Sequence, residues 1–328
     1  LKYNYFYYDI IIIIYSYIIL LNNTIKEDIM EECTLYGVFA PVPTPFYASG
    51  EIAWDKFIEN IKQFGKTTLD GILVLGSNGE AVSLSELEKI KLISLAREHF
   101  PLEKIVLAGV GCESEYSTLT LCKEASLAEV DGVVVINPTY YRNTVSNPEV
   151  MLDYFLRVAD QSTSPVLLYN IPRNTALNIP AWVSISASRH DNIIGIKDSS
   201  GDIIQLSTII HDSAPGFSVI AGSASFLLPT LYMGGCGGTM AYANIAPDYC
   251  KAIIKAFHEG EHNKAKKLQM DILELNAAIT SGFGITGLKY ALDCLGYYGG
   301  PCRSPLPSTL SDKDKSTMQQ LMKKVGLL

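Results

Sequence analysis

The chain has 328 residues, long enough to bury a large core, and its formal net charge is -8. It contains no cluster of lysine and arginine residues of the kind that binds a phosphate backbone, so nucleic acid is not expected as a partner. Its five histidines show no HxH or HExxH spacing, so a metal site is not expected either. The seven cysteines are scattered without a CxxC pair. We therefore expect reduced thiols in an intracellular protein rather than disulfides.

Residues 1–29 differ in composition from the rest of the chain. The almost wholly apolar run from Ile10 to Leu21 is shorter than the roughly 20 residues of a membrane span, so no membrane anchor is expected. The segment has no arginine, unlike a mitochondrial presequence. Its residue types are those that AT-rich codons encode. We expect it to lie outside the folded protein, with Met30 as the first residue. We expect a cytoplasmic protein, with the mitochondrion as the alternative compartment.

After Met30, short apolar runs alternate with longer stretches of helical character. The apolar runs are 37–42, 71–75, 105–110, 132–136, 165–170, 193–197, 218–221 and 238–241. The helical stretches between them include 54–67, 85–99, 115–128, 148–161 and 202–211. Two helix starts carry capping signals, because Ser85 precedes Glu88 by three residues and Asn147 directly precedes Pro148.

The eight apolar runs lack polar alternation, which indicates parallel strands covered on both faces. Eight strand–helix units predict an α/β fold of the (β/α)8 TIM barrel class over residues 30–260. The alternative is a doubly wound open sheet, but the GxGxxG fingerprint of that fold is absent after the first run. Residues 261–328 are predicted to form a C-terminal helical extension, with helices at 261–280, 284–295 and 311–324.

Lys197 ends the sixth apolar run. Read as a regular strand, this run points Ile194 and Ile196 to one face, and Gly195 and Lys197 to the other. A lysine inside a barrel is costly unless it has a function there, since burial disfavours the ammonium ion and favours a neutral amine that attacks carbonyls. The alternative is a lysine at a strand end that reaches solvent.

Small polar residues and tyrosines follow the other strands, at the end of the barrel where such folds place their chemistry. They are Ser77 and Asn78 after the second strand, Tyr140 and Tyr141 after the fourth, Tyr169 at the end of the fifth, Ser199 after the sixth and Gly222 after the seventh. One lysine in these surroundings indicates an enzyme that forms an imine with a 2-oxo acid, whose iminium withdraws electrons from a nearby C–C bond. A tyrosine can relay the protons, and the turn at 76–79 can hold the carboxylate.

Each of these features also has a purely structural interpretation. An aromatic residue in the position of Tyr169 more commonly fills the barrel, and residues 76–79 are equally typical of a tight turn. The glycine-rich run at 234–238 is typical of close packing, with a phosphate-binding loop as the alternative.

Four motifs resemble the dihydrodipicolinate synthase / N-acetylneuraminate lyase family, a family of pyruvate-handling (β/α)8 enzymes. The motifs are Gly-Ser-Asn-Gly-Glu at 76–80, Tyr-Asn-Ile-Pro at 169–172, Gly-Ile-Lys-Asp-Ser-Ser-Gly-Asp at 195–202 and Ala-Gly-Ser-Ala-Ser-Phe-Leu-Leu-Pro at 221–229. The resemblance extends from about Tyr36 to the C-terminus. It implies that Lys197 forms the Schiff base, that Tyr169 relays protons, and that Ser77 and Asn78 bind the pyruvyl carboxylate.

The resemblance also implies further properties of the site. Ser199 and Gly222 are expected to contact the substrate, which is a small 2-oxo acid, and no cofactor beyond the imine is expected. Tyr141 is expected to reach into the site of a neighbouring subunit, so the protein is expected to form a homodimer or homotetramer.

Two differences from the usual synthase motifs indicate which members of the family this chain resembles most. The synthases usually carry Thr-Thr where this chain has Ser77 and Asn78. Their arginine that binds the carboxylate of the second substrate falls at the position of Asn174. Arg173 stands one place earlier, and we expect this offset to point its side chain in a different direction. The Ser-Asn turn, Asn-Ala-Ala at 276–278 and the tail at 296–303 resemble 4-hydroxy-2-oxoglutarate aldolases and the fungal 2-keto-3-deoxy-L-galactonate aldolases.

The sequence therefore predicts a class I aldolase that cleaves a 4-hydroxy-2-oxo acid to pyruvate and an aldehyde. The alternatives are dihydrodipicolinate synthesis, a dehydratase of the same family and, from another class, a non-catalytic sensor of 2-oxo acids.

Overall fold

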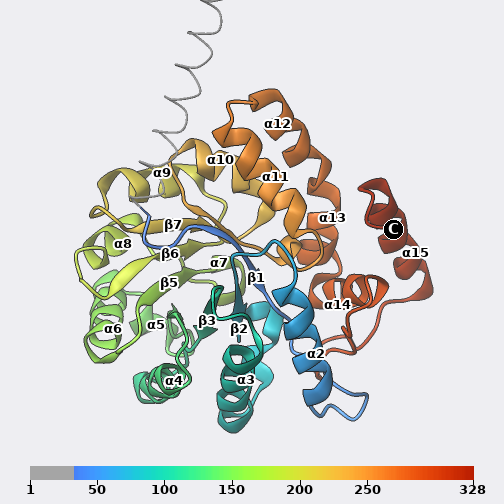
Figure 1. The fold of residues 1–328 in the computed structure, drawn as a ribbon. Helices are drawn as coiled ribbons and strands as arrows, with labels where there is room; N and C mark the ends of the chain where they lie inside the picture. Colours follow the sequence, from blue (N-terminus) through green and yellow to red (C-terminus); the bar gives the residue numbers. More distant parts are fainter. Residues whose placement is uncertain (1–32) are drawn as a thin grey trace, which may run out of the picture.

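The computed structural model describes residues 33–328, and the expectation for residues 1–29 falls outside this range. The strands form a closed barrel in which each pairs in parallel with the next and β1 closes onto β8 (Figure 1). The strands are β1 Gly37–Pro41, β2 Gly71–Val74, β3 Ile105–Gly109, β4 Gly132–Ile136, β5 Val166–Asn170, β6 Ile193–Asp198, β7 Ser218–Ala221 and β8 Gly237–Thr239. This confirms the predicted barrel and excludes the open sheet.

Helices surround the barrel, and the C-terminal helices lie together on one flank of it (Figure 1). The longer outer helices are α2 Trp54–Gly65, α3 Glu86–His99, α4 Glu115–Leu127, α6 Pro148–Gln161, α8 Ala181–Ala187, α9 Ile203–Asp212, α10 Leu227–Tyr232 and α11 Pro247–His258. The C-terminal helices are α12 His262–Asp271, α13 Leu273–Ala277, α14 Gly284–Cys294 and α15 Asp312–Lys324. Both capping predictions are confirmed: Ser85 and Glu88 form a capping box, and the Asn147 side chain accepts a hydrogen bond from the Glu149 N–H.

Short helical turns lie at the carboxyl ends of the strands and in the extension. They are η1 Ser77–Gly79, η2 Ala81–Ser83, α5 Arg142–Val145, α7 Pro172–Thr175, η3 Ala224–Phe226, η4 Ala241–Asn244 and η5 Ala278–Gly282. The prediction of one helix over 261–280 is wrong, because it breaks into α12, α13 and η5. Element η5 is a π-turn, closed by a hydrogen bond from the Phe283 N–H to the Ala278 carbonyl.

Two apolar cores hold the barrel. The inner core fills the barrel with one side chain or more from most strands, among them Phe39, Leu73, Leu107, Val134, Leu167 and Ile220. The outer core lies between the strands and the helices, and includes Val38, Ile72, Phe57, Val133 and Leu206. Because β1 to β7 each contribute to both cores, neither face of these strands meets solvent, which explains the absence of polar alternation.

Strand β6 is irregular, so the expected alternation along it is wrong. Val166 pairs with Ile193, but Leu167 pairs with Gly195, so β6 holds one residue more than β5 between these pairs. Ile194 therefore packs against the inner core, whereas Ile196 belongs to the outer core. After this bulge, Tyr169 pairs directly with Lys197.

The expectation that all cysteines are reduced is also wrong. Cys33, just before β1, forms a disulfide with Cys236, just before β8. A hydrogen bond from the Gly37 N–H to the Cys236 carbonyl brings the two segments together at the amino-terminal end of the barrel. The sequence separation of 203 residues gave no pattern from which to predict this pairing. The other cysteines, at 112, 122, 250, 294 and 302, are free.

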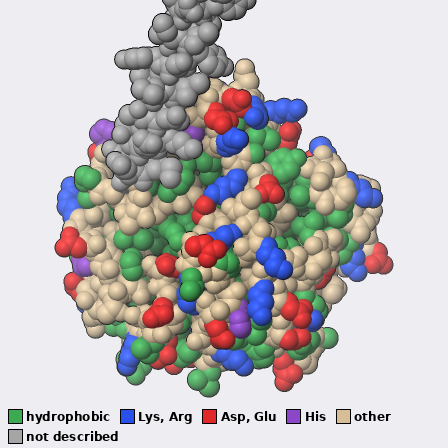
Figure 2. Space-filling view, in the orientation of Figure 1, with side chains coloured by type: hydrophobic (Ala, Val, Ile, Leu, Met, Phe, Trp, Pro, Cys, Tyr) green, Lys and Arg blue, Asp and Glu red, His purple; other side chains and the backbone are tan. Residues whose placement is uncertain are grey.

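On the surface shown in Figure 2, acidic and basic side chains are interspersed. No helix between residues 33 and 328 combines the length and hydrophobicity that a membrane crossing requires.

The disulfide predicts how many thiols can be labelled before and after reduction. Alkylation of the denatured protein without reductant should label the five free thiols, and alkylation after reduction should label all seven cysteines. Intact-mass measurement distinguishes the two states. Seven labels without reductant, in protein prepared under non-reducing conditions, would contradict the pairing.

Candidate active site

A cavity of about 660 Å³ opens at the carboxyl ends of the strands. It brings together six of the residues that the sequence singled out for the site, Ser77, Asn78, Tyr169, Lys197, Ser199 and Gly222, whereas Tyr140 and Tyr141 do not line it. These residues come from the ends of β2, β5, β6 and β7, so the closed barrel is what gathers them. Their roles stay predictions, but their convergence in one cavity is a property of the structure.

Lys197 and Tyr169 form the centre of this cavity. They are cross-strand neighbours on β6 and β5, and their exposed fractions are only 3% and 6%. The Lys197 Nζ lies 4.0 Å from the centroid of the Tyr169 ring. The Tyr169 hydroxyl lies 3.4 Å from the Ser77 Oγ, within hydrogen-bond distance. An amine, a phenol and an alcohol therefore stand side by side with little access to water.

The turn Ser77–Gly79 forms one wall of the cavity. It is a single 3-10 turn, in which the Gly79 N–H donates to the Gly76 carbonyl and the Glu80 N–H donates to the Ser77 carbonyl. The Thr44 hydroxyl donates to the Gly79 carbonyl at 2.7 Å and ties the turn to the loop after β1. The turn thus presents a hydroxyl and an amide in a backbone conformation fixed from more than one side.

Ser199 and Gly222 form the opposite wall. A Cβ atom on Gly222 would lie 1.8 Å from the Ser199 Oγ, so only glycine fits this position without moving Ser199. The Ser199 Oγ is buried, and within residues 33–328 it has no hydrogen-bond partner. Because buried hydroxyls are normally paired, this unpaired one at the cavity wall is a candidate for contact with a ligand.

Sequence reasoning missed the support behind the strand ends. The buried Asp198 carboxylate accepts hydrogen bonds from the side chains of Asn170, Ser200 and Gln205. Asn170 follows Tyr169 and Asp198 follows Lys197, so this network locks the two strand ends together just beyond the catalytic candidates. The only signal in the sequence was that Asn170 and Asp198 each directly follow an expected site residue.

Arg173 lies on the short helix α7 and lines the cavity together with Asn174. Its guanidinium reaches the Ser281 carbonyl of the π-turn, at 3.4 Å. We expected the one-residue offset to change the direction of the Arg173 side chain, because that expectation placed Arg173 at the end of a strand. The backbone here is a helical turn, and both residues face the same space. Among the described residues that line this cavity, Arg173 and Lys197 are basic and none is acidic, so the cavity favours an anion.

Tyr141 does not line this chain's cavity. It is 73% exposed on the loop after β4, where its ring contacts the exposed ring of Tyr140 edge to face. A tyrosine in this position is free to meet another subunit, and its expected role there stays a prediction.

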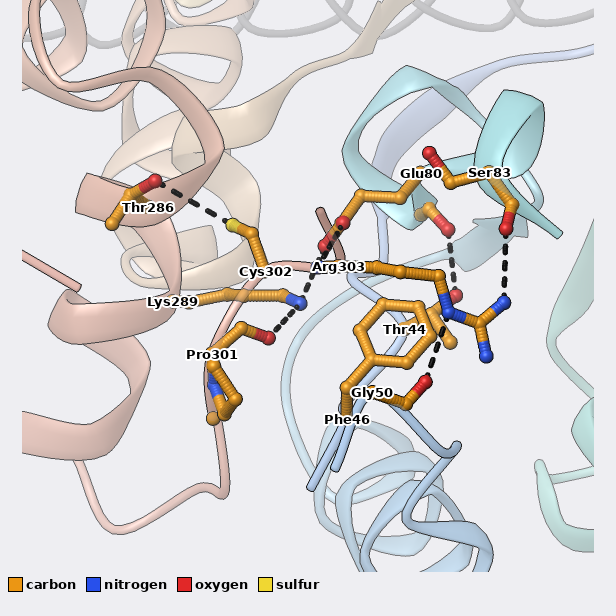
Figure 3. Close-up of polar contacts among 12 residues, drawn as sticks. Thr44, Phe46, Gly50, Glu80, Ser83, Thr286, Lys289, Pro301, Cys302 and Arg303 are labelled. Atoms are coloured by element: carbon orange, nitrogen blue, oxygen red, sulfur yellow. Dashed lines mark hydrogen bonds and ion pairs between the residues drawn. The ribbon is translucent and has the colours of Figure 1, made fainter. Parts of the chain in front are cut away.

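A buried ion pair behind the Ser77–Gly79 turn was also missed (Figure 3). The Lys289 Nζ lies 2.5 Å from the Glu80 Oε1, and both residues are at most 2% exposed. Burial lowers the pKa of Lys289 from its ordinary value, and the Glu80 carboxylate opposes that shift. Glu80 also adopts a left-handed backbone conformation, with φ of 54°, which costs a non-glycine residue roughly 1 kcal/mol. The sequence did not predict this pair because only Glu80 lies in a recognisable motif and Lys289 does not.

Comparison with known proteins agrees with this geometry. Residues 34–325 match the sequence model of the Dihydrodipicolinate synthetase family. A probable mitochondrial 4-hydroxy-2-oxoglutarate aldolase of Emericella nidulans is 33% identical over 298 residues, which cover 89% of this chain and 95% of the relative. A 4-hydroxy-tetrahydrodipicolinate synthase of Lachnoclostridium phytofermentans is 30% identical over 293 residues, 89% of this chain and 98% of the relative.

Among solved structures, a prophage protein of the dihydrodipicolinic acid synthase family from E. coli K12, in complex with pyruvate, superimposes with a TM-score of 0.83. It is 30% identical in sequence, and the match covers 90% of this chain and 100% of that protein.

Proposed function

Because this chain belongs to the dihydrodipicolinate synthetase family, and is thus a lyase of the Schiff-base-forming kind, we propose that it cleaves a 4-hydroxy-2-oxo acid to pyruvate and an aldehyde. The observation that carries this proposal is the buried amine of Lys197, held against the Tyr169 ring in a cavity that favours anions. An imine on Lys197 serves as the electron sink, so the proposed reaction uses no separate cofactor.

The proposed reaction begins when the Lys197 amine attacks the C2 ketone to give a carbinolamine. Tyr169 gives its proton to the carbinolamine hydroxyl, which leaves as water, and an iminium ion forms beside the Tyr169 phenolate. Tyr169 removes the proton of the C4 hydroxyl, the C3–C4 bond breaks, and its electron pair moves into the iminium to form an enamine. The aldehyde leaves, C3 takes up a proton, and water hydrolyses the imine to release pyruvate. Tyr169 suits the relay because its hydroxyl stands beside Ser77 at the cavity wall.

Ser77 and Asn78 are proposed to hold the C1 carboxylate with side-chain and backbone donors of the turn. Ser199 offers the unpaired buried hydroxyl on the opposite wall, and Gly222 leaves the room that the substrate and Ser199 need. The two walls together orient the ketone carbon towards Lys197.

Arg173 favours 4-hydroxy-2-oxoglutarate as the substrate, because a second carboxylate at the far end of the molecule would meet its guanidinium. 2-Keto-3-deoxy-L-galactonate is the second candidate, since the hydroxyl-bearing residues Thr280 and Ser281 also line the cavity and suit a polyol. A condensing synthase is the third, because one relative is a synthase and a cation for a second substrate is present.

We also propose that Tyr141 completes the proton relay of a neighbouring subunit in a homodimer or homotetramer. Further large apolar side chains that a partner would cover are exposed in η2, at the starts of α3 and α4, and next to Tyr141 in the sequence: Val82, Leu87, Tyr116 and Tyr140. The cytoplasmic placement stays a prediction.

The direct test of the proposed function is pyruvate release from 4-hydroxy-2-oxoglutarate, coupled to lactate dehydrogenase. Lys197→Ala should lower kcat at least a hundredfold, about 2.7 kcal/mol of barrier, because no other group forms the imine. Circular dichroism should show that the variant keeps its fold. Turnover above one hundredth of wild type in the folded variant would sink the assignment.

The role of Arg173 is tested by measuring both candidate substrates side by side. Arg173→Gln should lower kcat/KM for 4-hydroxy-2-oxoglutarate roughly tenfold or more, the loss of one charge-assisted hydrogen bond of about 1.5–3 kcal/mol. For 2-keto-3-deoxy-L-galactonate, which lacks the distal carboxylate, we expect little change. Arg189→Gln, after the outer helix α8, is the matched control. Equal losses for both substrates would rule out carboxylate recognition by Arg173.

A further inference from the structure

The residue that follows the substrate-facing turn is tied to the C-terminal extension. The Glu80 N–H donates to the Ser77 carbonyl at 3.1 Å, so Glu80 closes the turn that carries Ser77 and Asn78. Its side chain points away from that turn and its carboxylate is fully buried. Any shift of the Glu80 backbone therefore moves the turn with it.

Both oxygens of this carboxylate are held by the extension (Figure 3). The Glu80 Oε1 accepts from the Lys289 Nζ of α14, and the Oε2 accepts from the Arg303 N–H at 2.8 Å. Lys289 also donates to the Pro301 carbonyl, at 2.9 Å. The extension thus meets Glu80 with one side chain and one backbone group, each of which is itself anchored.

The Arg303 side chain reinforces the same junction. Its guanidinium donates to the carbonyls of Gly50 and Ser83, both at 2.9 Å, and to the Glu88 carboxylate of α3. Lys289 and Arg303 both lie against the ring of the buried Phe46, with its centroid 4.6 Å from the Nζ and 4.5 Å from the Cζ. The loop after β1, the turn region after β2 and the extension are therefore joined at one point.

We infer that Glu80 and Lys289 are positioning residues, which hold the Ser77–Gly79 turn in the conformation that binds the C1 carboxylate of the 2-oxo acid. The inference rests on the proposed carboxylate-binding role of Ser77 and Asn78. It makes the C-terminal extension part of the substrate-binding machinery. A purely structural role would instead affect stability without selecting between ligands.

The test compares two ketones that react with the same amine. Borohydride trapping on the Lys197 peptide is measured against the concentration of pyruvate, which has the carboxylate, and of hydroxyacetone, which lacks it. For Glu80→Gln and Lys289→Met, the pyruvate concentration for half-maximal trapping should rise at least tenfold. For hydroxyacetone it should stay within threefold of wild type, because the amine itself is untouched.

Lys251→Met is the matched control, because it removes the lysine partner of Asp70 at the opposite end of the barrel. It should leave both half-maximal concentrations unchanged. Unchanged pyruvate trapping in the Glu80 and Lys289 variants, or equal weakening for both ketones, would overturn the inference.

If a single substitution prevents folding, the double variant Glu80→Gln with Lys289→Met decides the question, since it removes both buried charges together. Selective weakening of pyruvate in the folded double variant supports the inference, and wild-type pyruvate trapping overturns it. If the wild-type protein itself forms no adduct with pyruvate on Lys197, the proposed function fails, and the inference with it.

Discussion

The register between β5 and β6 is the constraint on which the site depends. After the bulge, Tyr169 stands directly beside Lys197, and both side chains lie inside the barrel. If the pairing continued from Val166 and Ile193 without the extra residue, Tyr169 would stand beside Ile196, and the lysine would move to the outer face. A one-residue irregularity therefore decides whether the amine meets the substrate cavity. The Asp198 network just beyond this pair fixes the strand ends in that register.

The ion pair between Glu80 and Lys289 is better explained by the position in which it holds the turn than by a contribution to the stability of the fold. Replacing a buried ion pair with apolar residues is often neutral or stabilising, whereas removal of one partner alone costs about 3–5 kcal/mol. A pair of this kind adds little net stability but fixes the position of whatever it joins. Here it joins the left-handed residue at the end of a turn that lines the cavity to helix α14. The barrel supplies the amine, and the extension fixes the turn that we propose holds the carboxylate.

The barrel was predictable because its strands are short apolar runs between helical stretches, and some helix starts carry local signals such as the Ser85 capping box. The candidate site residues were predictable because they stand at strand ends, where a closed barrel gathers them. The bulge at Ile194 was not, since it is defined only by pairing with another strand. Glu80 and Lys289 are 209 residues apart, and no local pattern in the sequence connects them. The disulfide near β8 was missed for the same reason.

Mapping a trapped adduct shows whether Lys197 is the amine that forms the imine. The protein is incubated with pyruvate and borohydride, digested, and its peptides are analysed by mass spectrometry. We expect one reduced pyruvate adduct, on Lys197, while Lys289, the other buried lysine of the described chain, stays unmodified. An adduct on Lys289 or on a surface lysine alone, or no adduct at all, would contradict this expectation.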